Sequence, residues 1–382
     1  MTDQRPLRIL LVGDYENDAR FGSAKVSHKL REELRALGHQ CDAFFSRDIG
    51  RAPSGRQLRQ LVAPWLAGRA IARALASKSY DIVDTSSAEG LSFGVSRRFG
   101  RHSRTAYVCR SHGLEHRNYQ RMLDDAREGL THKPWTRRVW YPASRLSQVA
   151  AAAKLADRMI VLTAADRDFA QSRGWLPADR IDVIPHGVSD RFLHEAPATE
   201  RGGGALFCGT WDHVKGASYL VDAWAALLEG GCRVPLTVLG PGRPAHDVLH
   251  AFPERLRSLV TVIDRATEER VIEEYRRHDT LVFPSTFEGF GLVVLEALSQ
   301  GLPVIATPAG CAADLVVGGV TGLRVPARDG RALAAAVRTL MKDSGLRARL
   351  GRAGAAAVRA MTWRNTAAKT VDVYRHALSE LG

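Results

Sequence analysis

Short apolar runs alternate with amphipathic stretches along most of the chain. The first run, LRILLVGDY, is typical of a buried strand, and the apolar residues Val26, Leu30 and Leu34 then recur at helical spacing. Gly38 follows at a position where a glycine commonly ends a helix. The runs YDIVDTSS, TAYVCRSHG, RMIVLTA and IDVIPHG continue the alternation. We therefore predict βαβ units, in which helices cover both faces of a parallel sheet.

The alternation breaks once, near the middle of the chain. Residues 190–204 lose periodicity and collect proline, threonine and glycine. Strand-like runs then resume with ALFCGTW and continue through LTVLGPG, VTVIDRAT, TLVFPST, LPVIATP and GLRVPA. A chain of 382 residues is also longer than one hydrophobic core usually supports. We predict two doubly wound α/β domains, over residues 1–190 and 204–360, and consider a return of a final helix at 361–382 to the first domain.

Charge and cysteine usage narrow the class of protein only partly. The chain has 54 lysine and arginine residues against 41 aspartate and glutamate residues, a net charge of +13. This excess indicates an anionic partner, and it leaves nucleic acid, a membrane surface and a phosphorylated small substrate open. Five single cysteines without metal-ligand spacing indicate reduced thiols. The first apolar run is too short for a secretory signal, and none reaches the roughly 20 residues of a membrane span, so we expect a cytoplasmic protein.

The stretch FPSTFEGFGLVVLEALSQGLPVIATPAG carries two carboxylates. Glu288 falls in a glycine-containing loop after a strand, and Glu296 falls on the following helix, four residues after Leu292. This spacing turns Glu296 toward the loop, so both carboxylates can line one cavity. Free backbone N–H groups at the start of the helix suit a phosphate. Alternatively, the two glutamates are only a loop charge and a solvated helix charge.

The same stretch resembles the E-x7-E motif of retaining, nucleotide-sugar-dependent glycosyltransferases of the GT-B fold, the group 1 family that includes glycogen synthase and sucrose synthase-like enzymes. VIPHGVSDRF, FCGTWDHVKG and LTVLGPG resemble further motifs of that family. The resemblance covers the second domain nearly from end to end and the first only weakly. It implies two Rossmann-like domains that face each other across a cleft, with the donor bound by the second and the acceptor by the first.

The resemblance also assigns roles to residues. It implies that Glu288 contacts hydroxyls of the donor sugar, Glu296 accepts hydrogen bonds from the ribose, and Lys215 meets the diphosphate. Together with His112, Lys215 and Glu288 are the expected catalytic residues. The expected donor-binding residues are Gly22, Ser23, Gly209, Thr210, Lys215, Arg265, Glu288, Gly289, Phe290, Gly291, Leu292 and Glu296.

One departure from the family pattern concerns the phosphate site. The family usually has an arginine directly after the strand glycine, whereas here Thr210 follows Gly209. Arg243 or Arg265 could supply the missing charge, or Thr210 could donate a hydroxyl bond alone. The remaining alternative is weakened or altered donor chemistry.

The first domain offers fewer candidates. Gly22–Ser23 stands where the family has a Gly-Gly loop, and CRSHGLEH resembles the family's strand-end His-Gly, whose histidine lies beside the reacting sugar carbon. The resemblance implies this role for His112, and we assign Arg110 and His116 to acceptor binding. His186 reads as a turn residue near the hinge region.

Residues 132–145, HKPWTRRVWYPASR, mix basic and aromatic side chains. This composition suits anionic lipid headgroups or sugar stacking, and an ordinary surface loop and helix explain it equally well. Peripheral contact with the inner face of a membrane therefore stays open.

Together these observations predict a retaining glycosyltransferase that moves a sugar from a nucleotide-diphosphate sugar to a hydroxyl of a glycan, glycolipid or small molecule. The resemblance implies front-face transfer. We expect no metal, because no Asp-x-Asp pair stands where one would hold a cation, and we expect no cofactor and no nucleic acid partner. The alternatives are a sugar-nucleotide epimerase, a phosphorylase, whose cofactor lysine we do not find, and a basic lipid- or nucleic-acid-binding module on a degenerate transferase fold. The nucleotide, the sugar, the acceptor and the oligomeric state stay open.

Overall fold

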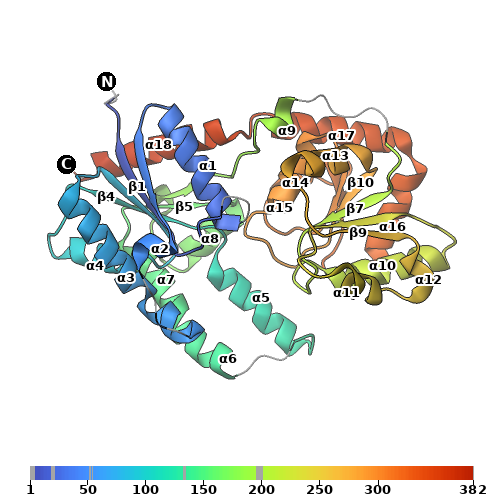
Figure 1. The fold of residues 1–382 in the computed structure, drawn as a ribbon, viewed down its shortest axis with the longest axis horizontal. Coiled ribbons are helices and arrows are strands. Elements are labelled where there is room, and N and C mark those ends of the chain that lie inside the picture. Colours follow the sequence, from blue (N-terminus) through green and yellow to red (C-terminus); the bar gives the residue numbers. More distant parts are fainter. Residues whose placement is uncertain are drawn as a thin grey trace. The chain divides into compact units, whose positions relative to one another are not determined.

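The chain folds into two compact units. The computed structural model describes residues 5–18, 22–50, 53, 55–131, 135–194 and 201–381. The first unit comprises Met1–His186 and Trp363–Gly382, and the second comprises Gly187–Thr362 (Figure 1). The first unit therefore contains the last helix of the chain, and the second begins before the aperiodic stretch at 190–204.

The first unit is built on a six-stranded parallel sheet with the order β2-β1-β3-β4-β5-β6. Its strands are β1 (Arg8–Val12), β2 (Gln40–Phe44), β3 (Ile82–Ser86), β4 (Ala106–Arg110), β5 (Arg158–Val161) and β6 (Ile181–Val183). Its helices are α1 (Gly22–Ala36), α2 (Ser46–Ile49), α3 (Arg56–Ser77), α4 (Leu91–Arg98), α5 (Glu115–Arg127), α6 (Trp135–Tyr141), the π-helical turn η1 (Pro142–Leu146), α7 (Ser147–Leu155), α8 (Ala164–Ser172), the 3-10 turn η2 (Ala178–Arg180) and α18 (Trp363–Ser379).

Alternate strand residues pack into separate cores on the two faces of this sheet. Leu10 and Val12 pack with residues of α3, α4 and α7 on one face. Ile9 and Leu11 pack with residues of α1 and α18 on the other, where Figure 1 shows these two helices side by side. The strands are therefore buried on both faces, which is why they read as continuous apolar runs in the sequence.

The second unit is built on another six-stranded parallel sheet, with the order β12-β11-β10-β7-β8-β9. Its strands are β7 (Ala205–Cys208), β8 (Leu236–Leu239), β9 (Val260–Ile263), β10 (Thr280–Phe283), β11 (Val304–Ala306) and β12 (Gly322–Arg324). Its helices are α9 (Arg191–His194), α10 (Ala217–Glu229), α11 (Ala245–His250), α12 (Glu254–Arg257), α13 (Glu268–Arg277), α14 (Leu292–Ser299), α15 (Ala312–Leu315), α16 (Gly330–Lys342) and α17 (Ser344–Val358).

Each sheet has one point at which its strand order reverses direction. The reversal lies between β1 and β3 in the first unit and between β7 and β10 in the second. Loops leaving the carboxyl ends of these neighbouring strands diverge, and ligands of doubly wound sheets bind there. The predicted α/β architecture is thus present in both units. Within the described ranges, no helix combines the length and apolar character needed to cross a bilayer.

Candidate active site

Two predicted residues meet at the reversal point of the second unit. Lys215, in the loop after β7, donates a hydrogen bond from Nζ to Glu288 Oε1, in the loop after β10, at 2.7 Å. Ser285 Oγ donates to the same oxygen at 3.0 Å. The Glu288 side chain is 9% exposed and that of Lys215 is 28% exposed. A cation and a carboxylate therefore stand together where a ligand of this sheet would bind.

A glycine allows these two loops to approach. Gly216 has a φ of 79°, and a Cβ at this position would clash with the carbonyl oxygen of Pro284. Thr286 N donates to the Val214 carbonyl oxygen at 2.7 Å. The backbone contact holds Lys215 within reach of Glu288, and only glycine tolerates both the conformation and the space.

A second glycine supports the Glu288 loop from the side of β11. Gly310 has a φ of 56°, and a Cβ there would clash with the carbonyl oxygen of Phe290. The neighbouring Cys311 N donates to that same oxygen at 2.6 Å. Gly291, with a φ of 88°, is the N-cap of α14, and the first residue of that helix, Leu292, comes four positions after Glu288. The predicted phosphate-binding backbone therefore has a fixed conformation.

Glu296 lies on α14 and is 8% exposed. Tyr275, on α13, donates its hydroxyl to Glu296 Oε2 at 3.1 Å. The same hydroxyl lies 3.8 Å from Cys208 Sγ at the end of β7. Burial raises the pKa of Tyr275 well above its ordinary value, so the hydroxyl keeps its proton and remains a donor. Tyr275 was not among the predicted residues, because its sequence context indicates only an amphipathic helix.

The loop that contains Thr210, which departs from the family pattern, is held by hydrogen bonds between its own residues. Thr210 Oγ1 donates to Asp212 Oδ2 at 2.8 Å, and Asp212 Oδ1 accepts from Lys215 N at 2.9 Å. Trp211 N donates to the Pro241 carbonyl oxygen at 2.8 Å, which keeps this loop beside the one after β8. Arg243 is exposed in that neighbouring loop, and Arg265 is exposed in the loop after β9. Of the two arginines considered as replacements, Arg243 thus lies in the loop adjoining Thr210.

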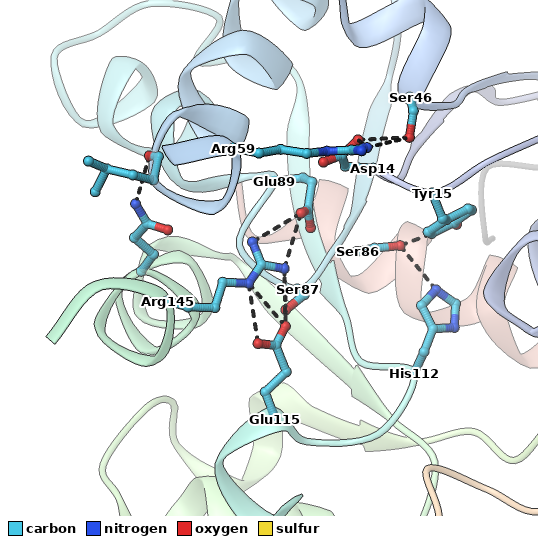
Figure 2. A network of polar contacts seen from close by, with 12 residues as sticks. Asp14, Tyr15, Ser46, Arg59, Ser86, Ser87, Glu89, His112, Glu115 and Arg145 are labelled. Atoms are coloured by element: carbon cyan, nitrogen blue, oxygen red, sulfur yellow. Dashed lines mark hydrogen bonds and ion pairs between the residues drawn. The ribbon is translucent and has the colours of Figure 1, made fainter. Parts of the chain in front are cut away.

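His112 stands at the end of β4 in the first unit. Its Nε2 is hydrogen-bonded to Ser86 Oγ at 3.0 Å, and Figure 2 shows Ser86 between His112 and Tyr15, whose hydroxyl lies 3.4 Å from the same Oγ. Burial, with a smaller contribution from Arg110, lowers the pKa of His112 to about 4. Among the described residues, His112 Nδ1 is buried without a hydrogen-bond partner. At neutral pH this histidine is therefore an uncharged imidazole.

Arg110 requires a correction. We predicted that it contacts an acceptor, but it is 4% exposed and its Nη2 donates to Asp84 Oδ2 at 2.7 Å in the interior. Tyr374 of α18 donates its hydroxyl to the same oxygen at 2.6 Å. A guanidinium held in this buried ion pair is not presented to a ligand. Arg110 instead fixes the end of β4, two residues before His112.

The remaining candidates of the first unit have different environments. His116 packs against Trp175, with ring centroids 4.7 Å apart, and lines a cavity of about 410 Å³ beside α5. Burial lowers its pKa to about 4. Gly22 begins α1 with a φ of 51°, and Ser23 follows it on the first turn. Residues 19–21, directly before them, lie outside the described part of the chain.

In the described ranges, metal-ligating side chains and cysteines do not gather into a cluster. There, no group of three or more histidine, cysteine, aspartate or glutamate side chains could hold a metal ion. The five cysteines are free thiols. Burial raises the pKa of Cys41 and of Cys109 to about 12, so these two thiols stay protonated.

Two doubly wound parallel sheets, each with polar side chains at its reversal point, define the GT-B class of proteins. Solved structures show the same fold. Sucrose-phosphate synthase from Thermosynechococcus elongatus matches with a TM-score of 0.76 at 22% identity, over 98% of this chain and 100% of that one. HepE from Anabaena, in complex with UDP, matches with a TM-score of 0.68 at 18% identity, over 96% of this chain and 99% of that one.

Sequence comparisons identify the family. Residues 203–343 match the model described as "Glycosyl transferases group 1", and residues 22–192 match "Glycosyltransferase Family 4". A D-inositol 3-phosphate glycosyltransferase from Xylanimonas cellulosilytica is 35% identical over 219 residues, 52% of each chain. Its counterpart from Acidothermus cellulolyticus is 33% identical over 260 residues, 63% of this chain and 57% of that one. The chain thus spans little more than half the length of these relatives. It belongs to the group 1 glycosyltransferases, and the predicted fold and family are confirmed.

Proposed function

We propose that this protein transfers a sugar from a nucleotide-diphosphate sugar to an acceptor hydroxyl, with retention of configuration. The observation that carries the proposal is the contact between Lys215 and Glu288 at the reversal point of the second unit, with Glu296 on the helix that follows. HepE, a neighbour in fold, has been solved with UDP-glucose, which supports a nucleotide-sugar donor. A degenerate binding module would have no need for this arrangement.

The chemistry follows from the charges at this site. When the bond between the anomeric carbon and the phosphate breaks, negative charge develops on the diphosphate, where the Lys215 ammonium and the N–H groups at the start of α14 stabilise it. Glu288 accepts hydrogen bonds from sugar hydroxyls, and Glu296 accepts them from the ribose. The acceptor oxygen attacks the same face of the sugar, and its proton passes to the departing phosphate oxygen. This route needs neither a protein nucleophile nor a metal ion.

His112 is the residue of the first unit that we place beside the reacting sugar. With a pKa of about 4, its imidazole is neutral at pH 7 and can exchange a hydrogen bond with a sugar hydroxyl without adding charge. Ser86 is hydrogen-bonded to Nε2 of His112, and this bond fixes the orientation of the ring and with it the direction of Nδ1. We assign His112 to orienting the reacting sugar rather than to proton abstraction.

Substitution of Glu296 tests the donor site. A thermal-shift panel of UDP-, GDP-, ADP- and TDP-sugars should show one class that stabilises the protein, because a ligand that binds only the native state raises its stability, by about 2.7 kcal/mol at 100 times Kd. Glu296→Ala should weaken that binding by roughly tenfold to a hundredfold, since a charge-assisted hydrogen bond contributes about 1.5–3 kcal/mol. Glu273→Ala, which removes a carboxylate that is 64% exposed on α13, is the matched control. Unchanged donor affinity in Glu296→Ala would refute the site.

We further propose that residues 132–145 contact an anionic membrane surface from the cytoplasmic side. Residues 132–134 lie outside the described part of the chain, but on α6 Val139 is 61% exposed beside Arg137 and Arg138, in a chain with a net charge of +13. Exposed apolar and basic residues on one helix suit an interfacial position.

Vesicle sedimentation tests the membrane proposal. The protein should sediment with vesicles that contain phosphatidylglycerol and much less with pure phosphatidylcholine. Val139→Asp should reduce sedimentation severalfold, because it places a negative charge against an anionic surface. Val320→Asp, at a position 55% exposed in the second unit, should have no effect. Equal sedimentation with both lipids would speak against this contact.

A further inference from the structure

A cavity of about 400 Å³ opens in the first unit between the start of α3, α5 and α6. Its volume falls in the range of about 300–1,000 Å³ that small-molecule sites occupy. Glu115, the first residue of α5, is part of its lining. No role has yet been assigned to this cavity.

The cavity is linked to His112 through the end of β3. Ser86 Oγ is bonded to His112 Nε2, and the next residue, Ser87, donates its hydroxyl to Glu115 Oε1 at 2.6 Å (Figure 2). Ser87 has a φ of 53°, a left-handed conformation that non-glycine residues seldom adopt and that costs about 1–2 kcal/mol. This turn directs two consecutive serines to two different partners. The cavity wall and His112 are thus fixed by the same strand end.

The lining of the cavity combines neutral polar groups with aromatic rings. Gln60 presents an amide that can both donate and accept, as sugar hydroxyls do, and Asn118 presents an amide whose nitrogen can donate, since its oxygen accepts from Arg121. Tyr119, Trp140 and Tyr141 present rings, which offer apolar faces with little conformational entropy to lose. A ligand with a ring of hydroxyl groups and an apolar C–H face fits both kinds of surface.

The charged groups at this cavity are already engaged. Arg145 lies between two carboxylates, 3.2 Å from Glu89 Oε1 and 3.0 Å from Glu115 Oε1. Glu89 is 3% exposed, and among the described residues its Oε2 has no hydrogen-bond partner. Tyr141 donates to Glu115 Oε2 at 2.9 Å. An anionic ligand would meet the Glu115 carboxylate, and the counter-charge of that carboxylate, on Arg145, is shared with Glu89.

The two arginines of the cavity lining, Arg121 and Arg137, are also occupied. Arg121 is paired with Asp125 and donates to Asn118 Oδ1 at 3.1 Å. Arg137 lies over the Tyr141 ring, 4.0 Å from its centroid, where the π-system stabilises the cation. The lining thus offers a phosphate poor electrostatic compensation, while uncharged hydroxyls meet donors and acceptors without displacing an ion pair.

We propose that this cavity binds an uncharged sugar residue of the acceptor, and not a phosphorylated polyol of the kind for which the relatives are named. The assignment rests on the proposed glycosyltransferase function and specifies the class of its acceptor. The sugar held between the amides and the rings would belong to the same acceptor molecule as the hydroxyl that reacts near His112.

Ligand-observed saturation-transfer NMR on the full chain tests this assignment without relying on turnover. The uncharged probes are the para-nitrophenyl glycosides of glucose, galactose, mannose and N-acetylglucosamine, and the charged probe is inositol 3-phosphate. At least one glycoside should bind, and Trp140→Ala and Gln60→Ala should each weaken it by roughly threefold to tenfold, as expected for a lost stacking or hydrogen-bonding partner. Trp65→Ala and Gln171→Ala, at exposed positions outside the lining, are the matched controls.

The outcomes distinguish failure of the proposed sugar subsite from failure of the proposed glycosyltransferase function. Failure of every glycoside to bind, binding that both lining variants leave unchanged, or inositol 3-phosphate binding that depends on Trp140 would each overturn the sugar subsite. Donor binding is measured in parallel by thermal shift. A protein that binds a nucleotide sugar but no glycoside loses only the subsite, whereas one that binds no nucleotide sugar loses the proposed function itself.

Discussion

Lys215 is the cation of the proposed donor site. Its ammonium lies 2.7 Å from Glu288, whose side chain is only 9% exposed. A diphosphate would offer this cation a second, more highly charged partner. The Lys215 ammonium therefore balances the charge of a nearly buried carboxylate and supplies a positive charge for the diphosphate.

Lys215→Met removes the ammonium and keeps most of the side-chain volume. We expect donor affinity to fall by roughly tenfold to a hundredfold, because a charged hydrogen-bonding partner is worth about 1.5–3 kcal/mol. Stability without donor should fall by about 1–3 kcal/mol, since Glu288 loses its counter-charge. Isothermal titration and thermal unfolding measure the two effects. Lys342→Met, at an exposed position on α16, is the control, and equal donor affinity in both variants would contradict the role given to Lys215.

The residues proposed for this site stand out in the sequence, but their contacts do not. The motif around Glu288 is local, so its carboxylate and glycines are visible in one stretch. Arg110 shows the limit, because its partners Asp84 and Tyr374 lie 26 and 264 residues away along the chain. A strand-end arginine looks the same in sequence whether it faces a ligand or an interior carboxylate.

At the scale of elements, the loop between β10 and α14 depends on support from the loop after β11. Gly310 allows that support, because its left-handed backbone and missing side chain let Cys311 N reach the Phe290 carbonyl oxygen. The conformation of the residues that follow Glu288 is therefore set by a glycine 22 positions further along the chain.

Gly310→Ala should destabilise the protein and weaken donor binding together. The left-handed conformation costs an alanine about 1–2 kcal/mol, and the clash with Phe290 adds about 1–3 kcal/mol. Gly319→Ala is a matched control, since Gly319 has a φ of 76° but open space around its Cα. Denaturant unfolding should show the larger loss for Gly310→Ala, and nucleotide-sugar binding should fall in that variant alone. Equal losses in the two variants would show that the contact with Phe290 is unimportant.

The strands and helices were largely predictable, whereas their spatial order was not. Continuous apolar runs such as TLVFPST and LPVIATP correspond to β10 and β11, because strands covered on both faces need no polar alternation. The pairing of β10 with β7, which brings Glu288 to Lys215, depends on crossovers that leave no local trace in the sequence. The sequence shows that Thr210 departs from the family pattern, but it does not show the hydrogen bond from Thr210 to Asp212.

At the scale of the whole molecule, histidines with depressed pKa values are distributed unevenly. Burial lowers the pKa of five in the first unit: His28, His39, His112, His116 and His186. In the second unit it lowers the pKa of His278. Chain folding thus keeps most of these imidazoles neutral within the unit that carries the proposed acceptor site.

This distribution predicts that mild acid unfolds the first unit before the second. Between about pH 6.5 and pH 4 the unfolded chain binds protons on histidines that the folded unit keeps neutral, so the free energy of unfolding falls as the pH falls. Each pKa unit of depression corresponds to about 1.4 kcal/mol, and the partly exposed histidines contribute less. Glu89, whose pKa burial raises, acts in the opposite direction, but as a single group against five.

Hydrogen exchange with mass spectrometry, corrected for its intrinsic pH dependence, resolves the two units within one sample. Protection of β3, β4 and α18 should fall between pH 7 and about pH 5 by a larger factor than protection of β10 and α14, which serve as the internal control. Because α18 packs on the first sheet, its protection should follow β3 and β4 although more than 200 residues separate it from them. Earlier loss of protection in β10 and α14 would contradict the pKa assignment. Loss of protection in α18 that does not follow β3 and β4 would contradict the membership of the last helix in the first unit.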